Sequence, residues 1–302
     1  MMLSKLRVKH PFLYALLIFV IFALSMSIVG GIISGVHMAI SPDGSKPPTM
    51  PLMLACEIVV AIVLCVVLKK SGRIRLLTKT GRGFKGGIAT GAYILVLGVF
   101  LVVGTIVGTQ MVGGFTVDFG GGSIVCMVAM ISIGLTEEIE ARALIGEPFL
   151  EHFGTKREGV IRAVVASGLI FGVMHIVNAL EAPLPDTLCQ MTLSITAGMM
   201  YGAIYFRSGN LWSCVVLHGF NDICSSIQLW LFNGGNGNIL SSTGDFSIDS
   251  VVFTLVLAAI DLAVACFLLR KSKIGEVAQT WPEIAEDGGM ASDADGAVKT
   301  AW

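Results

Sequence analysis

Eight long apolar runs constrain this chain more than any other feature. They lie at residues 11–36, 52–68, 86–113, 123–148, 158–180, 187–206, 211–232 and 251–269. A run of about 20 apolar residues suits an α-helix that crosses a hydrocarbon core roughly 30 Å thick. Of the 302 residues, 54% are hydrophobic and only 14% are charged, which is too apolar for a soluble domain. The sequence therefore predicts an all-α, polytopic membrane helix bundle with about eight transmembrane helices.

The charges of the connecting loops predict the orientation and the domain limits. Basic residues gather before the first run, at 69–85, and after the fourth, sixth and eighth runs, whereas the intervening loops hold one lysine. The positive-inside rule then places both termini in the cytoplasm. We expect a cytoplasmic N-terminal tail at 1–10, a transmembrane bundle over 11–273, and a flexible acidic cytoplasmic tail at 274–302.

Two further patterns indicate what the bundle contacts. The basic segment 69–85 predicts a contact with the anionic headgroups of the lipid bilayer, and nothing in the chain indicates nucleic acid binding. Glycines in small-xxx-small order occur at 31–35, 86–91 and 198–202. This spacing lets helices approach closely, so we expect one compact bundle rather than separate modules.

The fourth apolar run contains the charged stretch GLTEEIEARALIGEPF at 134–149. A charge at the centre of a membrane helix costs about 3 kcal/mol, so these residues need partners or an aqueous cavity. Glu138 and Arg142 are four residues apart with the acid first, which predicts a pair on one helix face. Glu137 is rotated by about 100°, so it remains free to face something else. A purely structural ion pair near the cytoplasmic end of this helix is the alternative.

Two more glutamates of this stretch, Glu140 and Glu147, lie closer to the end of the run. We expect the water of the headgroup region to solvate both side chains, and we assign them no chemical role. The charged stretch then reduces to an ion pair and one free carboxylate.

Two later runs each contain one histidine. His175 has Asn178 one helical turn on, and His218 has Asp222 four residues on. A carboxylate at this spacing can hold one ring nitrogen and fix the tautomer that faces a cavity. Either histidine could instead only hydrogen-bond between helices. A shared pocket with a carboxylate base and two imidazoles could activate water and stabilise an oxyanion, as peptide hydrolysis requires.

The depths of the two histidines argue against such a shared pocket. At about 1.5 Å per residue, His218 lies near the cytoplasmic end of its run and His175 near the opposite end. A tilted or broken helix, or different limits of the runs, would be needed to bring them together.

The three polar clusters resemble the motifs of one known family. EEIEAR at 137–142 matches an EExxxR motif, FGVMH at 171–175 an FxxxH motif and HGFND at 218–222 an HxxxN/D motif. These motifs belong to the CAAX prenyl protease 2-like intramembrane endopeptidases, also called the CPBP or Abi family. The resemblance covers residues 123–234 and implies a catalytic core there.

The resemblance implies a role for each matching residue. Glu137 would act with His175 to activate the attacking water. His218 would stabilise the tetrahedral oxyanion, and Asp222 would orient His218. Glu138 and Arg142 would support the site. We add Asn178 as a supporting residue because it lies one helical turn after His175.

The requirement for a metal is open at this point. His175, His218 and Glu137 could hold zinc, although the chain has no HExxH helix. The resemblance favours a glutamate-dependent mechanism that requires no cofactor.

Two classes of function fit the sequence. The first is an intramembrane endopeptidase that cleaves near the C-terminus of a lipid-modified or membrane-associated peptide. The alternative is a non-proteolytic protein of the same fold that acts in bacteriocin self-immunity or as a scaffold. The complete motif set favours the enzyme, because a non-proteolytic relative would be expected to lack one of these polar residues. For a prokaryotic source, the compartment would be the plasma membrane.

Overall fold

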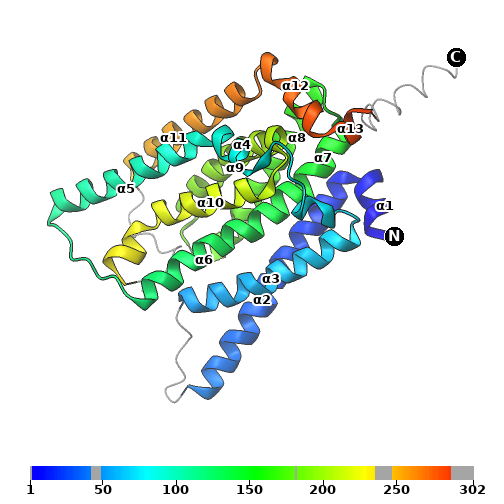
Figure 1. Cartoon of the computed structure of the whole chain (residues 1–302). Coiled ribbons are helices and arrows are strands. Elements are labelled where there is room, and N and C mark those ends of the chain that lie inside the picture. Colours follow the sequence, from blue (N-terminus) through cyan, green and yellow to red (C-terminus); the bar gives the residue numbers. More distant parts are fainter. Residues whose placement is uncertain (1, 42–48, 181, 235–246, 287–302) are drawn as a thin grey trace, which may run out of the picture.

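The computed structural model is a bundle of helices (Figure 1). It describes residues 2–41, 49–180, 182–234 and 247–286, and no strand occurs in these ranges. The α-helices are α1 (Met2–Lys9), α2 (Pro11–Ile40), α3 (Thr49–Lys70), α4 (Gly83–Thr90), α5 (Ala92–Val112), α6 (Gly121–Glu138), α7 (Glu147–Phe153), α8 (Arg157–Met174), α9 (Leu184–Ser208), α10 (Leu211–Ser225), α11 (Ile248–Leu268), α12 (Lys271–Thr280) and α13 (Pro282–Glu286). Four other helical segments are η1 (Ile74–Leu77), η2 (Ile139–Gly146), η3 (His175–Leu180) and η4 (Gln228–Phe232).

Six segments of the described chain are long and apolar enough to cross a membrane. They are α2, α3, α5, the continuous helix 121–153, the helix 157–180 and α11. Large apolar side chains on α2, α5 and α11 point outward, as a lipid-facing surface requires. The chain is an integral membrane protein, and the predicted all-α polytopic bundle is confirmed.

The other two predicted spans are helical but lie outside this set of six. The run 187–206 falls in α9, which packs against α8 and α11, and the run 211–232 divides into α10 and η4. α10 has only 15 residues, and it packs against α6 and α5. Because both helices pack against several neighbours, they can carry polar side chains that lipid would not tolerate.

Glycines bring α6 and α10 into backbone contact. A Cβ on Gly134 would lie 2.9 Å from the amide nitrogen of Gly219, and a Cβ on Gly219 would lie 3.0 Å from the Cα of Ile131. Each glycine is therefore needed for this close approach. The contact lies one turn before Glu138 and directly beside His218, so it sets the distance between the two motifs.

Two of the three small-residue patterns lie at close contacts between helices, and the third does not. Gly87 packs against Ser213 of α10, and Gly198 packs against Phe171 of α8. At Gly31 and Gly35, in contrast, an added Cβ would meet no described atom within 4 Å. The predicted close approach at 31–35 is therefore absent from the described part of the chain.

The two predicted cytoplasmic tails are folded in their described parts, and α1 and α13 lie at the same end of the bundle (Figure 1). At the N-terminal end, Arg7 of α1 is buried and forms ion pairs with Glu147 and Glu151 of α7. At the C-terminal end, Trp281 is 0% exposed, and its indole N–H donates to the Phe206 carbonyl at 2.8 Å. We call this end, which also carries the basic segment 69–85, the basic end.

The prediction of a flexible tail from residue 274 is wrong as far as residue 286. Val277, Trp281 and Ile284 are spaced by four and three residues, and all three are buried. This spacing gives α12 and α13 one apolar face, which the acidic average composition of the segment concealed. The rest of the predicted tail, 287–302, lies outside the described residues.

Glu276 attaches α12 to the bundle through several cations. Arg207 of α9 donates to Glu276 at 2.5 and 3.0 Å, Lys273 donates at 2.6 Å, and Arg82 also contacts it. Burial opposes ionisation of Glu276, but the hydrogen bonds from Lys273 and Arg207 and the charge of Arg82 outweigh it and lower the pKa to about 2. The carboxylate of Glu276 is therefore charged at neutral pH while α12 is docked.

We predict that Glu276→Gln loosens α12 and α13 at neutral pH. Since the folded-state pKa of about 2 lies below the ordinary value of 4.5, the docking contribution is complete above pH 4.5 and is lost as the pH falls toward 2. The hydrogen-exchange protection factors of the amides of residues 271–286, which compare each rate with the intrinsic rate at the same pH, should fall in the variant at pH 7, and in the parent only at acidic pH. Glu158→Gln, at an exposed position, is the control. Unchanged exchange in Glu276→Gln would contradict the docking role.

Candidate active site

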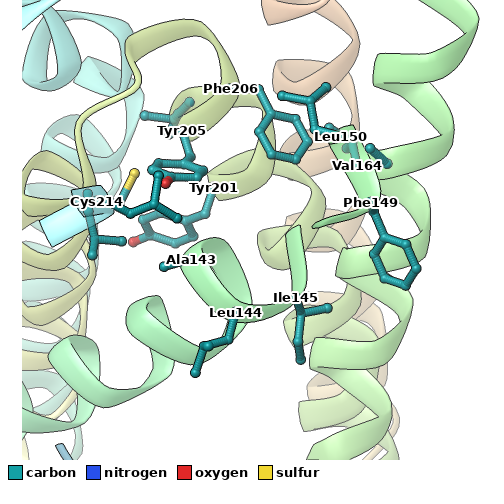
Figure 2. Close-up of a cluster of buried hydrophobic side chains, with 14 of the residues drawn as sticks. Ala143, Leu144, Ile145, Phe149, Leu150, Val164, Tyr201, Tyr205, Phe206 and Cys214 are labelled. Carbon is teal, nitrogen blue, oxygen red and sulfur yellow. The ribbon is translucent and has the colours of Figure 1, made fainter. Parts of the chain in front are cut away.

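A π-helical segment carries the first motif. Glu137 and Glu138 end α6, and Arg142 lies in η2, where the amide of Glu147 donates to the carbonyl of Arg142, five residues back. Such wider turns often occur at functional sites. All eight residues of η2 are buried, and Figure 2 shows its residues Ala143, Leu144 and Ile145 within the hydrophobic cluster.

The predicted pair between Glu138 and Arg142 is confirmed. Arg142 Nε donates to Glu138 Oε2 at 2.9 Å, and both side chains are 0% exposed. Arg142 also donates to the carbonyl of Gly198 on α9 at 2.7 Å. The pair therefore connects the first motif to a second helix and is part of the core.

His218 lies against the same glutamate. Its Nδ1 is 2.9 Å from Glu138 Oε1, whereas its Nε2 is 3.6 Å from Glu137 and 3.7 Å from Asp222. Only the first distance is short enough for a hydrogen bond. The side chains of Glu137 and Asp222 are 20% and 21% exposed. One face of the cluster is thus buried and the other is accessible.

The orienting contact predicted for Asp222 is made by Glu138 instead. The contact between Gly134 and Gly219 brings Glu138 closer to His218 than the neighbour four residues along α10. A carboxylate at Nδ1 fixes the tautomer and leaves Nε2 as the nitrogen that faces Glu137. Asp222 therefore lies near Nε2 without forming a hydrogen bond to it.

The start of α10 determines where His218 is placed. Gly209 has a φ of 64°, the left-handed conformation that ends a helix and favours glycine. Asn210 follows, and its side chain accepts from the amide of Ser213 at 2.9 Å, which caps the first turn of α10. His218 then lies two turns into a short helix rather than at the end of a long span.

His175 lies at the end of α8, close to the same aromatic side chain as His218. Its Nδ1 is 2.9 Å from the carbonyl of Phe171, and the Phe171 ring is 5.1 Å from the His175 ring and 6.3 Å from the His218 ring. Both histidine rings therefore lie beside one phenylalanine ring, so the predicted difference in depth does not separate them. Within the described residues, His175 forms no hydrogen bond or ion pair with Glu137, His218 or Asp222.

Two predictions remain to be placed in the structure, namely Asn178 as a supporting residue and the candidate metal ligands. Asn178 donates to Gln190 at 2.9 Å and so joins η3 to α9. In the ranges that the structure describes, no group of three or more His, Cys, Asp or Glu side chains is arranged to hold a metal ion. The possible zinc site of His175, His218 and Glu137 stays a prediction, and the proposed mechanism uses only the groups of the protein.

The expectation that headgroup water solvates Glu140 and Glu147 is wrong, because both residues are fully buried. Glu147 pairs with Arg73 at 3.0 Å and with Arg7 at 3.9 Å. Neither carboxyl oxygen of Glu140 has a hydrogen-bond partner among the residues that the structure describes. α1 and the basic segment after α3 reach Glu147 through Arg7 and Arg73, whereas α2 and α3 pack against η2, which contains Glu140. The sequence spacing within one run could not reveal these contacts.

Sequence analysis also missed Glu57. This residue of α3 is buried, and its carboxylate accepts a hydrogen bond from Thr136, the residue before Glu137. Its signal was present, because it is a single charged residue within the apolar run 52–68. Because a charge inside a membrane helix is costly, Glu57 needs a partner just as the charges of the fourth run do.

Comparison with known families agrees with this geometry. Residues 120–224 match the family model described as type II CAAX prenyl endopeptidase Rce1-like. The resemblance predicted from the motifs is confirmed. All three motifs fall within the matched residues, so the chain carries a segment of an intramembrane protease-type family. No curated protein matches the chain.

We predict that Arg142→Ala destabilises the bundle by about 3–5 kcal/mol, because it leaves Glu138 charged and buried without its cation. The double variant Glu138→Gln/Arg142→Met should regain much of this loss, since both charges are then removed. Thermal unfolding in detergent micelles measures both effects. A melting temperature of Arg142→Ala equal to that of the parent would show that the pair is not needed in the core.

A second prediction concerns the unpaired carboxyl group of Glu140. Glu140→Gln removes an acidic group that has no cation or hydrogen-bond partner, so we expect equal or higher thermal stability. Glu138→Gln is the matched comparison, because Glu138 has two partners and its loss should lower stability. A large drop in melting temperature for Glu140→Gln would mean that this carboxyl group has a stabilising partner.

Proposed function

We propose that this protein is an intramembrane endopeptidase that hydrolyses a peptide bond with water activated by Glu137. The observation that carries the proposal is the fixed orientation of His218. Glu138 holds its Nδ1 at 2.9 Å, and its Nε2 faces the partly exposed Glu137 at 3.6 Å. A general base and a hydrogen-bond donor are thus directed at the same accessible position, as attack on a carbonyl requires.

The proposed reaction needs one proton acceptor and one donor. Glu137 takes a proton from water as the water oxygen bonds to the carbonyl carbon, and Nε2 of His218 donates a hydrogen bond to the developing oxyanion. When the carbon–nitrogen bond breaks, Glu137 returns the proton to the leaving amine. His175 assists Glu137 from the edge of the site, and Asp222 adds negative charge that favours an imidazolium at His218.

The surroundings of the site indicate the class of substrate. The cluster lies inside a bundle whose outer surface is apolar, so the substrate must reach it from the bilayer or from its interface. We propose a lipid-modified or membrane-associated peptide that is cleaved near its C-terminus, in the plasma membrane of a prokaryote. A scaffold or a role in bacteriocin self-immunity is the alternative, and it would leave Glu137 dispensable.

The test compares two adjacent glutamates. Glu137→Gln keeps the size of the side chain and removes its basicity, so cleavage should fall by about 10²–10⁴-fold while the fold is retained. Glu138→Gln should lower both activity and stability, because Glu138 holds Arg142 and His218 together. Glu158→Gln should behave as the parent.

The measurement is cleavage of lipid-modified and unmodified peptides in liposomes that contain the purified protein, followed by mass spectrometry. Parallel melting curves separate a loss of chemistry from a loss of folding. Full cleavage of a confirmed substrate by Glu137→Gln would overturn the proposed mechanism. Cleavage of no membrane peptide by the parent would favour the non-proteolytic alternative.

A further inference from the structure

Tyr201 of α9 contacts the site although it belongs to none of the three motifs. Its ring stacks on the imidazole of His218, with 5.0 Å between ring centroids and 25° between ring planes. Tyr201 is 3% exposed, and the guanidinium carbon of Arg142 lies 5.7 Å from its ring centroid. The tyrosine therefore touches both residues that Glu138 connects.

The helix that carries Tyr201 is itself fixed to the site. Gly198, one turn earlier on α9, accepts the hydrogen bond from Arg142 at 2.7 Å. A Cβ on Gly198 would lie 3.0 Å from the Phe171 ring, so this part of α9 is held close to α8 as well. The Tyr201 ring consequently has little freedom to move away from His218.

From this geometry we infer that Tyr201 is a positioning residue for His218. The hydrogen bond from Glu138 fixes one nitrogen of the imidazole but leaves the ring able to turn about the line through that nitrogen. A flat ring stacked on one face restricts this turn and keeps Nε2 directed at Glu137. The catalytic part of this role rests on the proposed function, whereas the restriction of the ring does not.

The ring of Tyr201, rather than its hydroxyl group, has the contacts that matter. The hydroxyl oxygen is buried and has no hydrogen-bond partner in the described part of the chain. Phenylalanine should therefore preserve the role, and a side chain without a planar ring should not. This distinction separates stacking from hydrogen bonding.

Tyr205 supplies a matched control on the same helix. It is also buried, and its hydroxyl group also has no hydrogen-bond partner. Its ring packs against Phe206 at 6.0 Å and Trp281 at 5.4 Å instead of against a site residue. Figure 2 shows both tyrosines extending from α9 into one hydrophobic cluster. Loss of either ring removes comparable core volume, but only Tyr201 touches His218.

The experiment uses the full chain in detergent micelles with ¹⁵N-labelled histidine. The variants are Tyr201→Phe, Tyr201→Leu, Tyr201→Met and Tyr205→Leu, and His218→Gln identifies the signal of His218. Methionine has nearly the volume of leucine, but its unbranched and flexible side chain adapts better to an irregular gap, so it provides a second variant if leucine prevents folding. Melting curves and the imidazole nitrogen shifts are recorded for each protein across pH.

We expect Tyr201→Leu and Tyr201→Met to change the tautomer balance and the titration midpoint of His218, while Tyr201→Phe keeps both. Tyr205→Leu should lower the melting temperature and leave the His218 signal unchanged. An unchanged His218 signal in the Leu and Met variants would overturn the inference. So would a shift in Tyr205→Leu as large as theirs, because that outcome would indicate a general loss of packing.

Cleavage assays provide a second readout that depends on the proposed function. In Tyr201→Leu and Tyr201→Met, kcat should fall by about tenfold or more with KM changed little, since positioning acts on the reacting groups. Tyr201→Phe should restore the parent rate. If the parent cleaves no peptide, the proposed function fails, and the nitrogen shifts alone still decide whether Tyr201 positions His218.

Discussion

The double attachment of Glu138 is the interaction on which the site depends. One carboxylate accepts from Arg142 of the same helix and holds His218 of α10. Burying a carboxylate in a membrane protein is costly unless cations and hydrogen bonds satisfy both oxygens. Here the two partners come from different motifs, so the charge that would destabilise an isolated helix instead fixes two helices together. Glu137, the adjacent residue, is left partly exposed.

The membrane class, the motif residues and the Glu138–Arg142 pair could all be predicted from the sequence, because each depends on local spacing or on composition. The partner of His218 could not. Spacing along α10 suggested Asp222, but the contact between Gly134 and Gly219 is a property of two helices and places Glu138 nearer. The Glu138–Arg142 prediction was correct because both residues lie on one helix. The partner predicted for His218 was wrong because Glu138, which lies nearer than Asp222, belongs to another helix.

Burial was the other property that the sequence concealed. Glu140 was expected in headgroup water and Trp281 in a flexible tail, yet both are fully buried. In each case a segment distant in sequence covers the residue. α2 and α3 pack against η2, which contains Glu140, and α9 packs against α12 and accepts a hydrogen bond from Trp281. Apolar run length describes contact with lipid, but it does not describe which protein segments pack over the ends of the spans.

The π-helical turn η2 has a consequence for the rotational phase of the helix 121–153. A wider turn accommodates about one extra residue, and one residue corresponds to about 100° of rotation in an α-helix. Everything after η2 therefore faces a direction that a regular helix of this sequence would not give. Glu147 and Glu151 reach Arg7 and Arg73 at the basic end through this phase shift. Arg142, the partner of Glu138, lies in η2, and the anchors of α1 follow it, so both interactions involve the segment that contains the irregular turn.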